Sequence, residues 1–341
     1  MRVLIPAALS ALAIASRAPA APVESLGGQT MGTTWSVRYV PMPGAGAAHS
    51  AATLRAAVEQ RLAEVIDQMS HWEPGSVLSR YNDAAPGTWH PLPPAFRTVL
   101  ACALCVAAES GGAFDPALGA LVDLWGFGPA PARTEPPAPR EIEAARARCG
   151  WQRLTLDTAR QSLLQPGGVR LDFSGIAKGF AVDHVADGLR QAGLVHFLVE
   201  IGGELRGEGV KPDGSPWWVA IERPPHLPQA APGWQETRVA LHGLAIATSG
   251  DYRRGFAWQG RHYAHTLDPR TGWPLDNGII SATVLHPSCM EADAYATAFG
   301  VLGAEAALDL ATRRDIAACL LRRTSAGVEE ILSPALIAML D

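Results

Sequence analysis

Cysteine and basic charge are both scarce in this chain. Five cysteines among 341 residues are too few, and odd in number, for a fold built on disulfide bonds. Lysine and arginine total 28 against 33 aspartate and glutamate residues, which gives a net charge of −5. Proteins that bind nucleic acid usually present a basic surface, so this composition argues against nucleic acid as a partner.

Familiar signatures of nucleotide, metal and nucleophilic sites are missing as well. The chain has no Gly-x-Gly-x-x-Gly turn and no P-loop, so the standard dinucleotide and nucleoside triphosphate sites are not indicated. It also lacks zinc-ligand spacing, a nucleophile elbow and a clear glycosidase carboxylate pair. Cys102 and Cys105 have redox-motif spacing inside an apolar helical run. We interpret them as core residues or an incidental bridge, and their pairing stays open.

Long apolar runs are confined to the N-terminus. Met1-Arg2 precedes a largely apolar stretch from Val3 to Ala15, and Ala18-Pro-Ala-Ala21 offers small residues for cleavage. The stretch is short for a membrane-spanning helix, which makes an uncleaved anchor the weaker alternative. We therefore predict an export signal over residues 1–21 and a periplasmic location. No cysteine lies near this segment, so a lipid anchor is not indicated.

The remaining residues, 22–341, are predicted to form a single α+β domain. Helical periodicity runs through Ala52–Met69, Cys289–Leu302 is also predicted to be a helix, and residues 197–208 have the pattern of two short strands. Strands and helices do not alternate in a βαβ rhythm, so we expect mixed, mostly antiparallel sheets with flanking helices. His242-Gly243 between two apolar runs predicts a two-residue hairpin turn.

The most informative stretch is Leu171-Asp-Phe-Ser-Gly-Ile-Ala-Lys-Gly-Phe-Ala-Val-Asp183. It predicts a strand over 171–173, a tight turn at Ser174-Gly175 and a helix that continues to about Gly193. Main-chain N–H groups at a helix N-terminus, with Lys178 in the first turn, suit a phosphate group. Asp172 at the predicted strand end can bind a ribose, a base edge or a metal. A plain helix cap with a surface lysine is the alternative interpretation.

Two further clusters lie in the C-terminal third. Asp293 and Thr297 are four residues apart in a predicted helix, so both lie on one face and can reach one hard cation such as Mg²⁺. His265, followed by Asp268 and Arg270, is a candidate general base, because a neutral histidine can take a proton from a hydroxyl group. Structural roles remain the alternative for both clusters: a helix-start acid with a packed threonine, and a structural histidine.

Taken together, blocks along the chain resemble the ApbE family of FAD:protein FMN transferases. No single block is decisive, but the set in this order is specific and covers essentially the whole chain after the export signal. The blocks are Met31–Trp35, Met69–Trp72 with Ser79–Asn82, Gly112–Pro116, Leu171–Gly179, Glu200–Gly203, Ala247–Tyr252, His265–Gly272 and Ala292–Thr297.

The resemblance implies a T-fold-like architecture and an enzyme that binds FAD with Mg²⁺, cleaves the pyrophosphate and releases AMP. FMN would be attached through a phosphoester to a threonine or serine of an acceptor protein, which is flavinylation. By the family pattern, Asp293, Thr297 and the main-chain carbonyl of Gly175 would hold Mg²⁺. His265 would be the base, with Asp268 in reserve. The FAD site would be lined by Met31, Trp72, Ala113, Phe114, Asp115, Asp172, Lys178 and Leu267.

The resemblance also implies the kind of acceptor. Family acceptors are exported or membrane-bound redox proteins, such as subunits of a redox-driven pump or a reductase, with a short Asp-Gly/Ala-x-Ser/Thr-Ala-Thr/Ser motif. The enzyme would then work close to a membrane surface. Three alternatives remain: a Mg²⁺-dependent FAD pyrophosphatase that uses water, a non-catalytic flavin-binding protein and a redox flavoenzyme. The flavin-binding protein is a weaker alternative because flavin storage needs no base. The redox flavoenzyme is weaker because the chain has no nicotinamide fingerprint.

Overall fold

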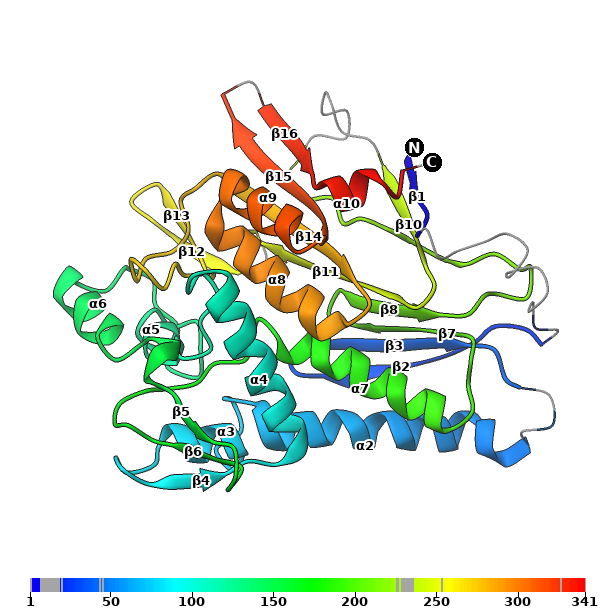
Figure 1. The fold of residues 1–341 in the computed structure, drawn as a ribbon, viewed down its shortest axis with the longest axis horizontal. Helices are drawn as coiled ribbons and strands as arrows, with labels where there is room; N and C mark the ends of the chain where they lie inside the picture. Colours follow the sequence, from blue (N-terminus) through cyan, green and yellow to red (C-terminus); the bar gives the residue numbers. More distant parts are fainter. Residues whose placement is uncertain are drawn as a thin grey trace.

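The computed structural model describes residues 2–6, 19, 21–42, 44, 46–224, 227, 236–252, 254–325 and 327–340. Its main element is an eight-stranded sheet in the order β16-β15-β14-β11-β8-β7-β3-β2 (Figure 1). All neighbours in this sheet are antiparallel. The strands are β2 Glu24–Thr30, β3 Thr33–Tyr39, β7 Phe197–Ile201, β8 Glu204–Glu208, β11 Leu244–Gly250, β14 Ile279–His286, β15 Ala317–Thr324 and β16 Gly327–Leu332.

Three small sheets accompany the main one. In the first, β10 (Thr237–Leu241) lies between β9 (Trp217–Ala220) and the parallel β1 (Arg2–Leu4). The second is the hairpin of β12 (Gly255–Trp258) and β13 (Arg261–Ala264). The third has the order β4-β6-β5, with β4 Trp89–Pro91, β6 Ser162–Leu164 and β5 Thr155–Asp157.

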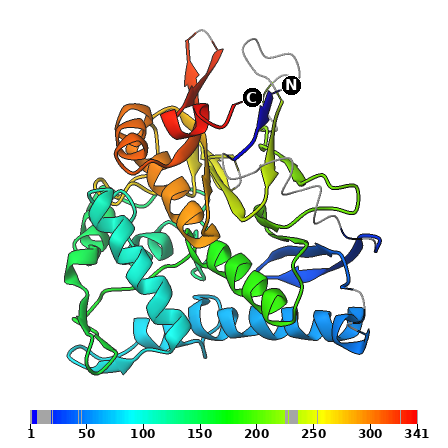
Figure 2. The same ribbon diagram turned by 45° about the vertical axis from the view of Figure 1, so that its right-hand side comes forward.

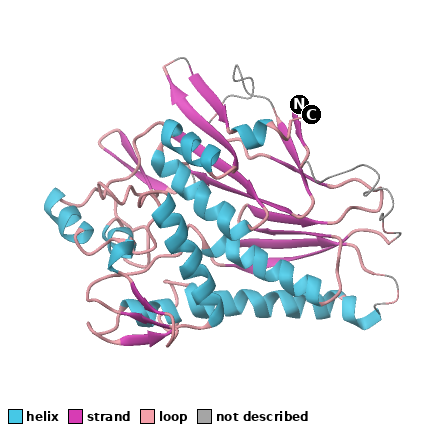
Figure 3. Ribbon diagram, viewed as in Figure 1, coloured by secondary structure: helices cyan, strands magenta, loops and turns pink. Residues whose placement is uncertain are grey.

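The longer helices gather over one face of the main sheet (Figure 3). The largest hydrophobic cluster fills the space between this face and helices α2, α4, α7 and α8. This arrangement confirms the predicted α+β class with mostly antiparallel sheets. The helices are α2 Ala51–Met69, α3 Val77–Asn82, α4 Pro94–Glu109, α5 Gly119–Leu124, α6 Pro139–Arg146, α7 Ala177–Gln191, α8 Cys289–Leu302, α9 Ala304–Arg313 and α10 Pro334–Ile337, with 3₁₀ turns η1 Gly46–His49 and η2 Trp151–Arg153.

Helix α8 is enclosed on nearly all sides. It packs on β11 and β14 of the sheet and also contacts α4, α7 and α9. Its sequence is accordingly apolar around the whole helix, with alanines at 292, 294, 296 and 298 that are all buried. Small side chains let neighbouring elements approach closely, so the few polar residues on α8 occupy fixed positions inside the fold.

One end of the main sheet collects several loops that matter for the site. Strand β8 begins at Glu204, and Leu205 lies opposite Ile246 of β11. Strand β11 therefore ends, at Gly250, at the end of the sheet where β8 begins. Gly250 lies opposite Ser281, near the start of β14. The β2–β3 turn at Met31-Gly32 lies at this end too, because β3 is antiparallel to β7.

Two local predictions were wrong. Residues 171–173 form no strand. The side chain of Asn82 accepts from the Leu171 N–H at 2.6 Å and donates to the Leu171 carbonyl at 2.9 Å, and the Asp172 N–H donates to the Pro116 carbonyl at 2.9 Å. His242-Gly243 is not a hairpin turn, because β10 and β11 belong to different sheets and the chain crosses between them there. Gly207 permits this crossing, since an added Cβ would lie 2.6 Å from the Leu241 Cβ.

The two ends of the chain meet at one edge of the fold. Leu4 is fully buried and forms a bridge with Leu340, and both termini lie together in two views (Figures 1 and 2). Most of the predicted export signal, residues 7–18 and 20, lies outside the described residues, so that signal stays a prediction. In the part of the chain that is described, no helix combines the length and apolar character needed to cross a membrane.

Candidate active site

A cavity of about 270 Å³ opens between the loop end of the main sheet, the N-terminus of α7 and the middle of α8. It brings together residues that are far apart in the sequence, and most of the predicted site residues line it. These are Ala113, Phe114, Asp115, Asp172, Gly175, Lys178, His265, Leu267, Asp293 and Thr297. The predicted phosphate, metal and acid–base groups therefore face one common space.

Three predicted residues are not in this lining. Met31 lies at the tip of the β2–β3 turn and packs partly against the core. Trp72 is 53% exposed on the loop after α2, with its ring 5.5 Å from that of His71. Asp268 makes two hydrogen bonds of 2.9 Å with the Arg270 guanidinium, so its carboxylate is committed to that pair. The roles of Met31 and Trp72 in FAD binding stay predictions.

The three proposed metal-binding groups converge at the contact between the 174–176 turn and α8. An added Cβ at Gly175 would lie 2.8 Å from the Thr297 hydroxyl oxygen, so the turn passes directly over that side chain. Asp293 is 5% exposed, and both it and Thr297 line the cavity. One carboxylate, one hydroxyl and one carbonyl are the hard oxygen donors that suit Mg²⁺ with water and phosphate ligands.

This set differs from a dense ligand cluster. No group of three or more His, Cys, Asp or Glu side chains with a metal-site arrangement occurs among the residues the structure describes. That result is compatible with the proposed set, which contains a single carboxylate. The residues present fit Mg²⁺.

A glycine sets the distance between α7 and α8. A Cβ added at Gly179 would overlap the Cys289 carbonyl oxygen and lie 2.7 Å from the Asp293 Cβ. The Gly179 N–H donates to Asp293 Oδ2 at 3.0 Å. The absence of a side chain therefore lets the two helices touch at the position where Asp293 faces the cavity.

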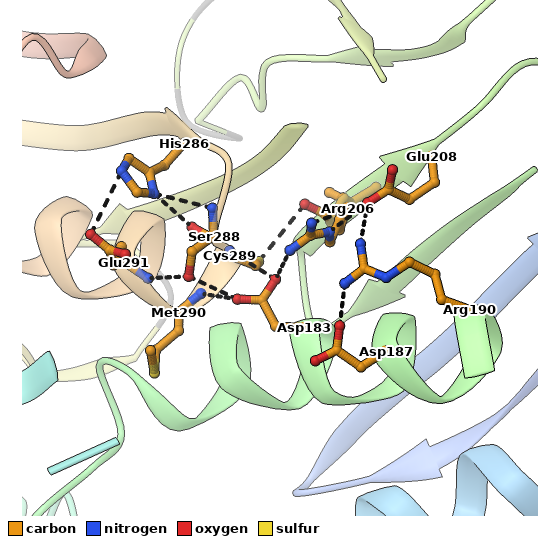
Figure 4. Close-up of polar contacts among 11 residues, drawn as sticks. Asp183, Asp187, Arg190, Arg206, Glu208, His286, Ser288, Cys289, Met290 and Glu291 are labelled. Carbon is orange, nitrogen blue, oxygen red and sulfur yellow. Dashed lines mark hydrogen bonds and ion pairs between the residues drawn. The ribbon is translucent and has the colours of Figure 1, made fainter. Parts of the chain in front are cut away.

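A polar cluster fixes the N-terminus of α8 against α7 (Figure 4). Asp183 accepts hydrogen bonds from the main-chain N–H groups of Cys289 and Met290, both at 3.0 Å, and from the Ser288 hydroxyl at 2.9 Å. Its other partner is Arg206, at 2.5 Å. A carboxylate at a helix N-terminus satisfies unpaired N–H groups and interacts favourably with the helix dipole. Asp183 thus determines the position of α8 along α7.

Lys178 lies in the first turn of α7, as predicted, and forms an ion pair with Glu204. Glu204 is 1% exposed at the start of β8, and both residues line the cavity. A buried carboxylate next to the amino group holds the lysine side chain across the cavity wall. Sequence reasoning did not single out Glu204, although it follows the Gly202-Gly203 turn directly.

Asp172 is paired with a residue that sequence reasoning overlooked. Its Oδ2 lies 3.4 Å from His71 Nδ1, and its Oδ1 accepts from the Ser174 N–H at 2.6 Å. Burial by itself raises the pKa of Asp172, but His71 and the Ser174 N–H outweigh it and lower that pKa below its ordinary value. Burial lowers the pKa of His71, but the neighbouring Asp172 raises it, and the net result is an increase. Asp172 is therefore an ionised carboxylate at the cavity wall near neutral pH.

Asp115 has the opposite character. Burial raises its pKa to about 6, although hydrogen bonds from the main chain at Ala117 and Trp151 oppose the increase. The Ala117 N–H donates to Asp115 Oδ1 at 2.8 Å. A carboxyl group with this pKa can be either a donor or an acceptor near neutral pH.

His265 lies directly after β13 and is held on two sides. Its N–H donates to the Arg254 carbonyl at 3.1 Å, and its ring Nδ1 lies 3.2 Å from the same oxygen. A carbonyl oxygen can only accept, so in the neutral ring the proton is on Nδ1 and the lone pair is on Nε2. The Phe127 ring packs edge-on, with centroids 6.5 Å apart. These contacts fix the orientation of the His265 ring at the cavity wall.

Other lining residues escaped the sequence analysis. Arg254 brings a guanidinium group to the cavity, Thr248 and Ser249 bring hydroxyl groups, and Val122 and Phe127 form an apolar wall. Thr248 and Ser249 lie near the end of strand β11, and nothing in the sequence places Arg254 or the α5 region beside them. Tertiary packing brings these segments together.

Known proteins resemble this chain over nearly its whole length. The family model described as ApbE family matches residues 31–320. A Vibrio cholerae protein named FAD:protein FMN transferase is 38% identical over 333 residues, which are 98% of this chain and 97% of that protein. A Haemophilus influenzae protein of the same name is 37% identical over 93% of this chain and 91% of its own length.

Solved structures give the same result. The flavin transferase ApbE from Vibrio cholerae, as a histidine-to-glycine mutant, superimposes with a TM-score of 0.85 at 36% identity over 94% of this chain and all of that chain (100%). The apo form of Pseudomonas stutzeri flavinyl transferase ApbE gives 0.83 at 39% identity, over 93% of this chain and 96% of that one. Sequence and fold agree over nearly the whole length, and the chain belongs to the ApbE family.

Proposed function

We propose that this protein is a Mg²⁺-dependent FAD:protein FMN transferase, which releases AMP and attaches FMN to a threonine or serine of an acceptor protein. One observation carries the proposal: His265, Lys178 and the oxygen donors Gly175, Asp293 and Thr297 line the same cavity. A base, a phosphate-binding cation and a site for a hard cation are the groups that phosphoryl transfer requires.

The chain's own residues would bind and orient FAD. The pyrophosphate would lie at the N-terminus of α7, where Lys178 and the positive end of the helix dipole favour negative charge. Leu118, Val122 and Phe127 provide an apolar wall for one of the flat rings. Asp115, which changes protonation near neutral pH, would hydrogen-bond a polar edge of the ligand.

The proposed metal ligands are the carbonyl of Gly175, the carboxylate of Asp293 and the hydroxyl of Thr297. When bound, Mg²⁺ neutralises charge on the pyrophosphate and improves AMP as a leaving group. Gly179 and Asp183 keep these ligands in place, because they determine how closely and in which register α8 meets α7.

The transfer step begins with proton removal. His265 Nε2 takes the proton from the acceptor hydroxyl, whose oxygen attacks the phosphorus of the FMN half of FAD. A new phosphorus–oxygen bond to the acceptor forms as the bond to the bridging pyrophosphate oxygen breaks. That oxygen and its electron pair leave with AMP. The phosphorus remains in the phosphate oxidation state, so no redox partner is required.

We also propose an exported location and an exported acceptor. The predicted signal over residues 1–21 supports this, since the acceptor threonine would have to lie in the same compartment. The acceptor would be a redox protein at or in the membrane, such as a pump or reductase subunit, that carries the short Asp-Gly/Ala-x-Ser/Thr-Ala-Thr/Ser motif.

The test combines the protein with FAD, Mg²⁺ and an acceptor fragment that carries this motif. We expect the acceptor threonine to gain the mass of FMN, with one AMP released per FMN attached. His265→Ala and Asp293→Ala should abolish both products, whereas Arg261→Gln, on the outside of the β12–β13 hairpin, should not. AMP with free FMN and an unmodified acceptor would show a pyrophosphatase. Bound FAD with no product would show a flavin-binding protein.

A further inference from the structure

The cavity is lined by a cationic side chain that makes no polar contact within the described part of the fold. Arg254 lines the cavity just before β12. Within the described part of the chain, its guanidinium group takes part in no hydrogen bond and no ion pair. Most arginines near the site are engaged, as Arg270 is with Asp268 and Arg206 is with Asp183. Arg254 is exposed, and its place in the cavity lining makes its guanidinium group available to a ligand anion.

The main chain of Arg254 has a defined position. Its carbonyl oxygen accepts the His265 N–H at 3.1 Å and lies 3.2 Å from His265 Nδ1. Arg254 and His265 are therefore neighbours across the start of the β12–β13 hairpin. The positive charge of Arg254 also lowers the pKa of His71, so its field reaches the side of the cavity where Asp172 lies.

The other charged side chains at the cavity leave the binding of a ligand anion to the guanidinium group of Arg254. Lys178 is paired with Glu204, and Asp172 is paired with His71. The pairing with Glu204 offsets the charge of Lys178, while the pyrophosphate of FAD carries negative charge. An arginine can contact two phosphate oxygens at once through its planar fork of N–H groups, which a lysine cannot do.

We propose that Arg254 is a catalytic residue that binds the phosphate of the FMN half of FAD, beside His265, and stabilises the negative charge that develops there during transfer. This inference rests on the proposed function and adds a residue to it. Arg254 donates N–H groups to phosphate oxygens and exchanges no proton. Charge stabilisation of this kind strengthens as the phosphoryl group is transferred, so its effect appears in turnover as well as in binding.

The test uses Arg254→Gln and Arg254→Lys in the full chain, with Arg261→Gln as the matched control. Arg261 is on the same hairpin, is paired with Asp276 at 2.8 Å and does not line the cavity. Every variant keeps the carbonyl of residue 254 that orients His265. FAD binding is measured with EDTA, which prevents turnover, and AMP release is measured with Mg²⁺, both with the acceptor and with water.

In Arg254→Gln we expect AMP release to fall about 100-fold in kcat/KM, with the acceptor and with water alike, as for the loss of one transition-state donor. FAD binding without metal should weaken, and Arg254→Lys should recover part of each loss. Arg261→Gln should match the wild type. Loss of transfer to the acceptor with unchanged FAD binding and unchanged AMP release to water would overturn the proposal and assign Arg254 to the acceptor. Wild-type values in Arg254→Gln would overturn it too. If the wild-type protein binds FAD but releases no AMP, the proposed function is refuted instead. The comparison of FAD binding without metal distinguishes this failure from a failure of the proposal for Arg254.

Discussion

Replacing Gly179 by alanine tests whether the contact between α7 and α8 positions the metal-binding face of α8. The new methyl group would overlap the Cys289 carbonyl oxygen and lie 2.7 Å from the Asp293 Cβ. The obstructing oxygen belongs to the main chain and cannot rotate away, so the cost should be near the top of the range of about 1–3 kcal/mol for overpacking. Alanine returns about 1 kcal/mol of helix propensity. The expected net loss is therefore about 2 kcal/mol of unfolding free energy.

The assay for Gly179→Ala has two parts. Guanidinium chloride unfolding measures the lost stability, and the Mg²⁺ concentration for half-maximal AMP release should rise about tenfold, since supporting contacts of metal ligands typically have effects of that size. Gly300→Ala in α8 is the matched control, because an added Cβ there meets nothing within 4 Å. It should be stabilising by about 0.5–1 kcal/mol. A Gly179→Ala protein with wild-type stability and Mg²⁺ dependence would refute this account of the helix contact.

Two further predictions concern acidic residues. Asp183→Asn should reduce the unfolding free energy by about 2 kcal/mol, because the half-buried Arg206 keeps Glu208 but loses the charge of Asp183, and the N-terminus of α8 loses a charged acceptor. Asp187→Asn, in an exposed pair with Arg190, should change it by less than about 0.5 kcal/mol in the same denaturant titration. Equal effects of the two substitutions would contradict the role of Asp183. The pKa of Asp115 is raised to about 6 in the fold, so the folded state keeps this proton longer than the unfolded chain, and stability should fall as pH rises from about 4 to 6. Asp115→Asn should remove that part of the pH dependence, and an unchanged profile would show that burial of Asp115 is not its cause.

The sequence predicted the elements with strong periodicity and the residues inside compact motifs. Helix α2 follows its apolar pattern, α8 covers the residues predicted as a helix, and Lys178 lies in the first turn of α7 as its motif indicates. Cys102 and Cys105 are both free thiols; Cys102 packs partly against the core, but Cys105 is exposed, so its interpretation as a core residue was wrong. Local patterns were sufficient in these cases because the neighbours that matter are near in sequence.

Contacts between distant segments could not be predicted in the same way. His71 pairs with Asp172, and Arg254 shares the cavity with both, yet no spacing in the sequence relates them. The strand predicted at 171–173 failed for a similar reason: the Asn82 side chain satisfies the main chain there in place of a neighbouring strand. The hairpin turn predicted at His242-Gly243 is wrong because the strands on either side of it, β10 and β11, belong to different sheets.

Strand β1 links the folded domain to the predicted export signal. Arg2–Leu4 lies beside β10, Leu4 is fully buried, and Arg2 forms an ion pair with Glu330. If residues 1–21 are removed during export, the mature protein loses this strand, and β10 becomes the edge of a two-stranded sheet with unpaired N–H and carbonyl groups. The precursor and the mature enzyme would then be different folded molecules, with signal cleavage acting as a late step in the maturation of the domain surface.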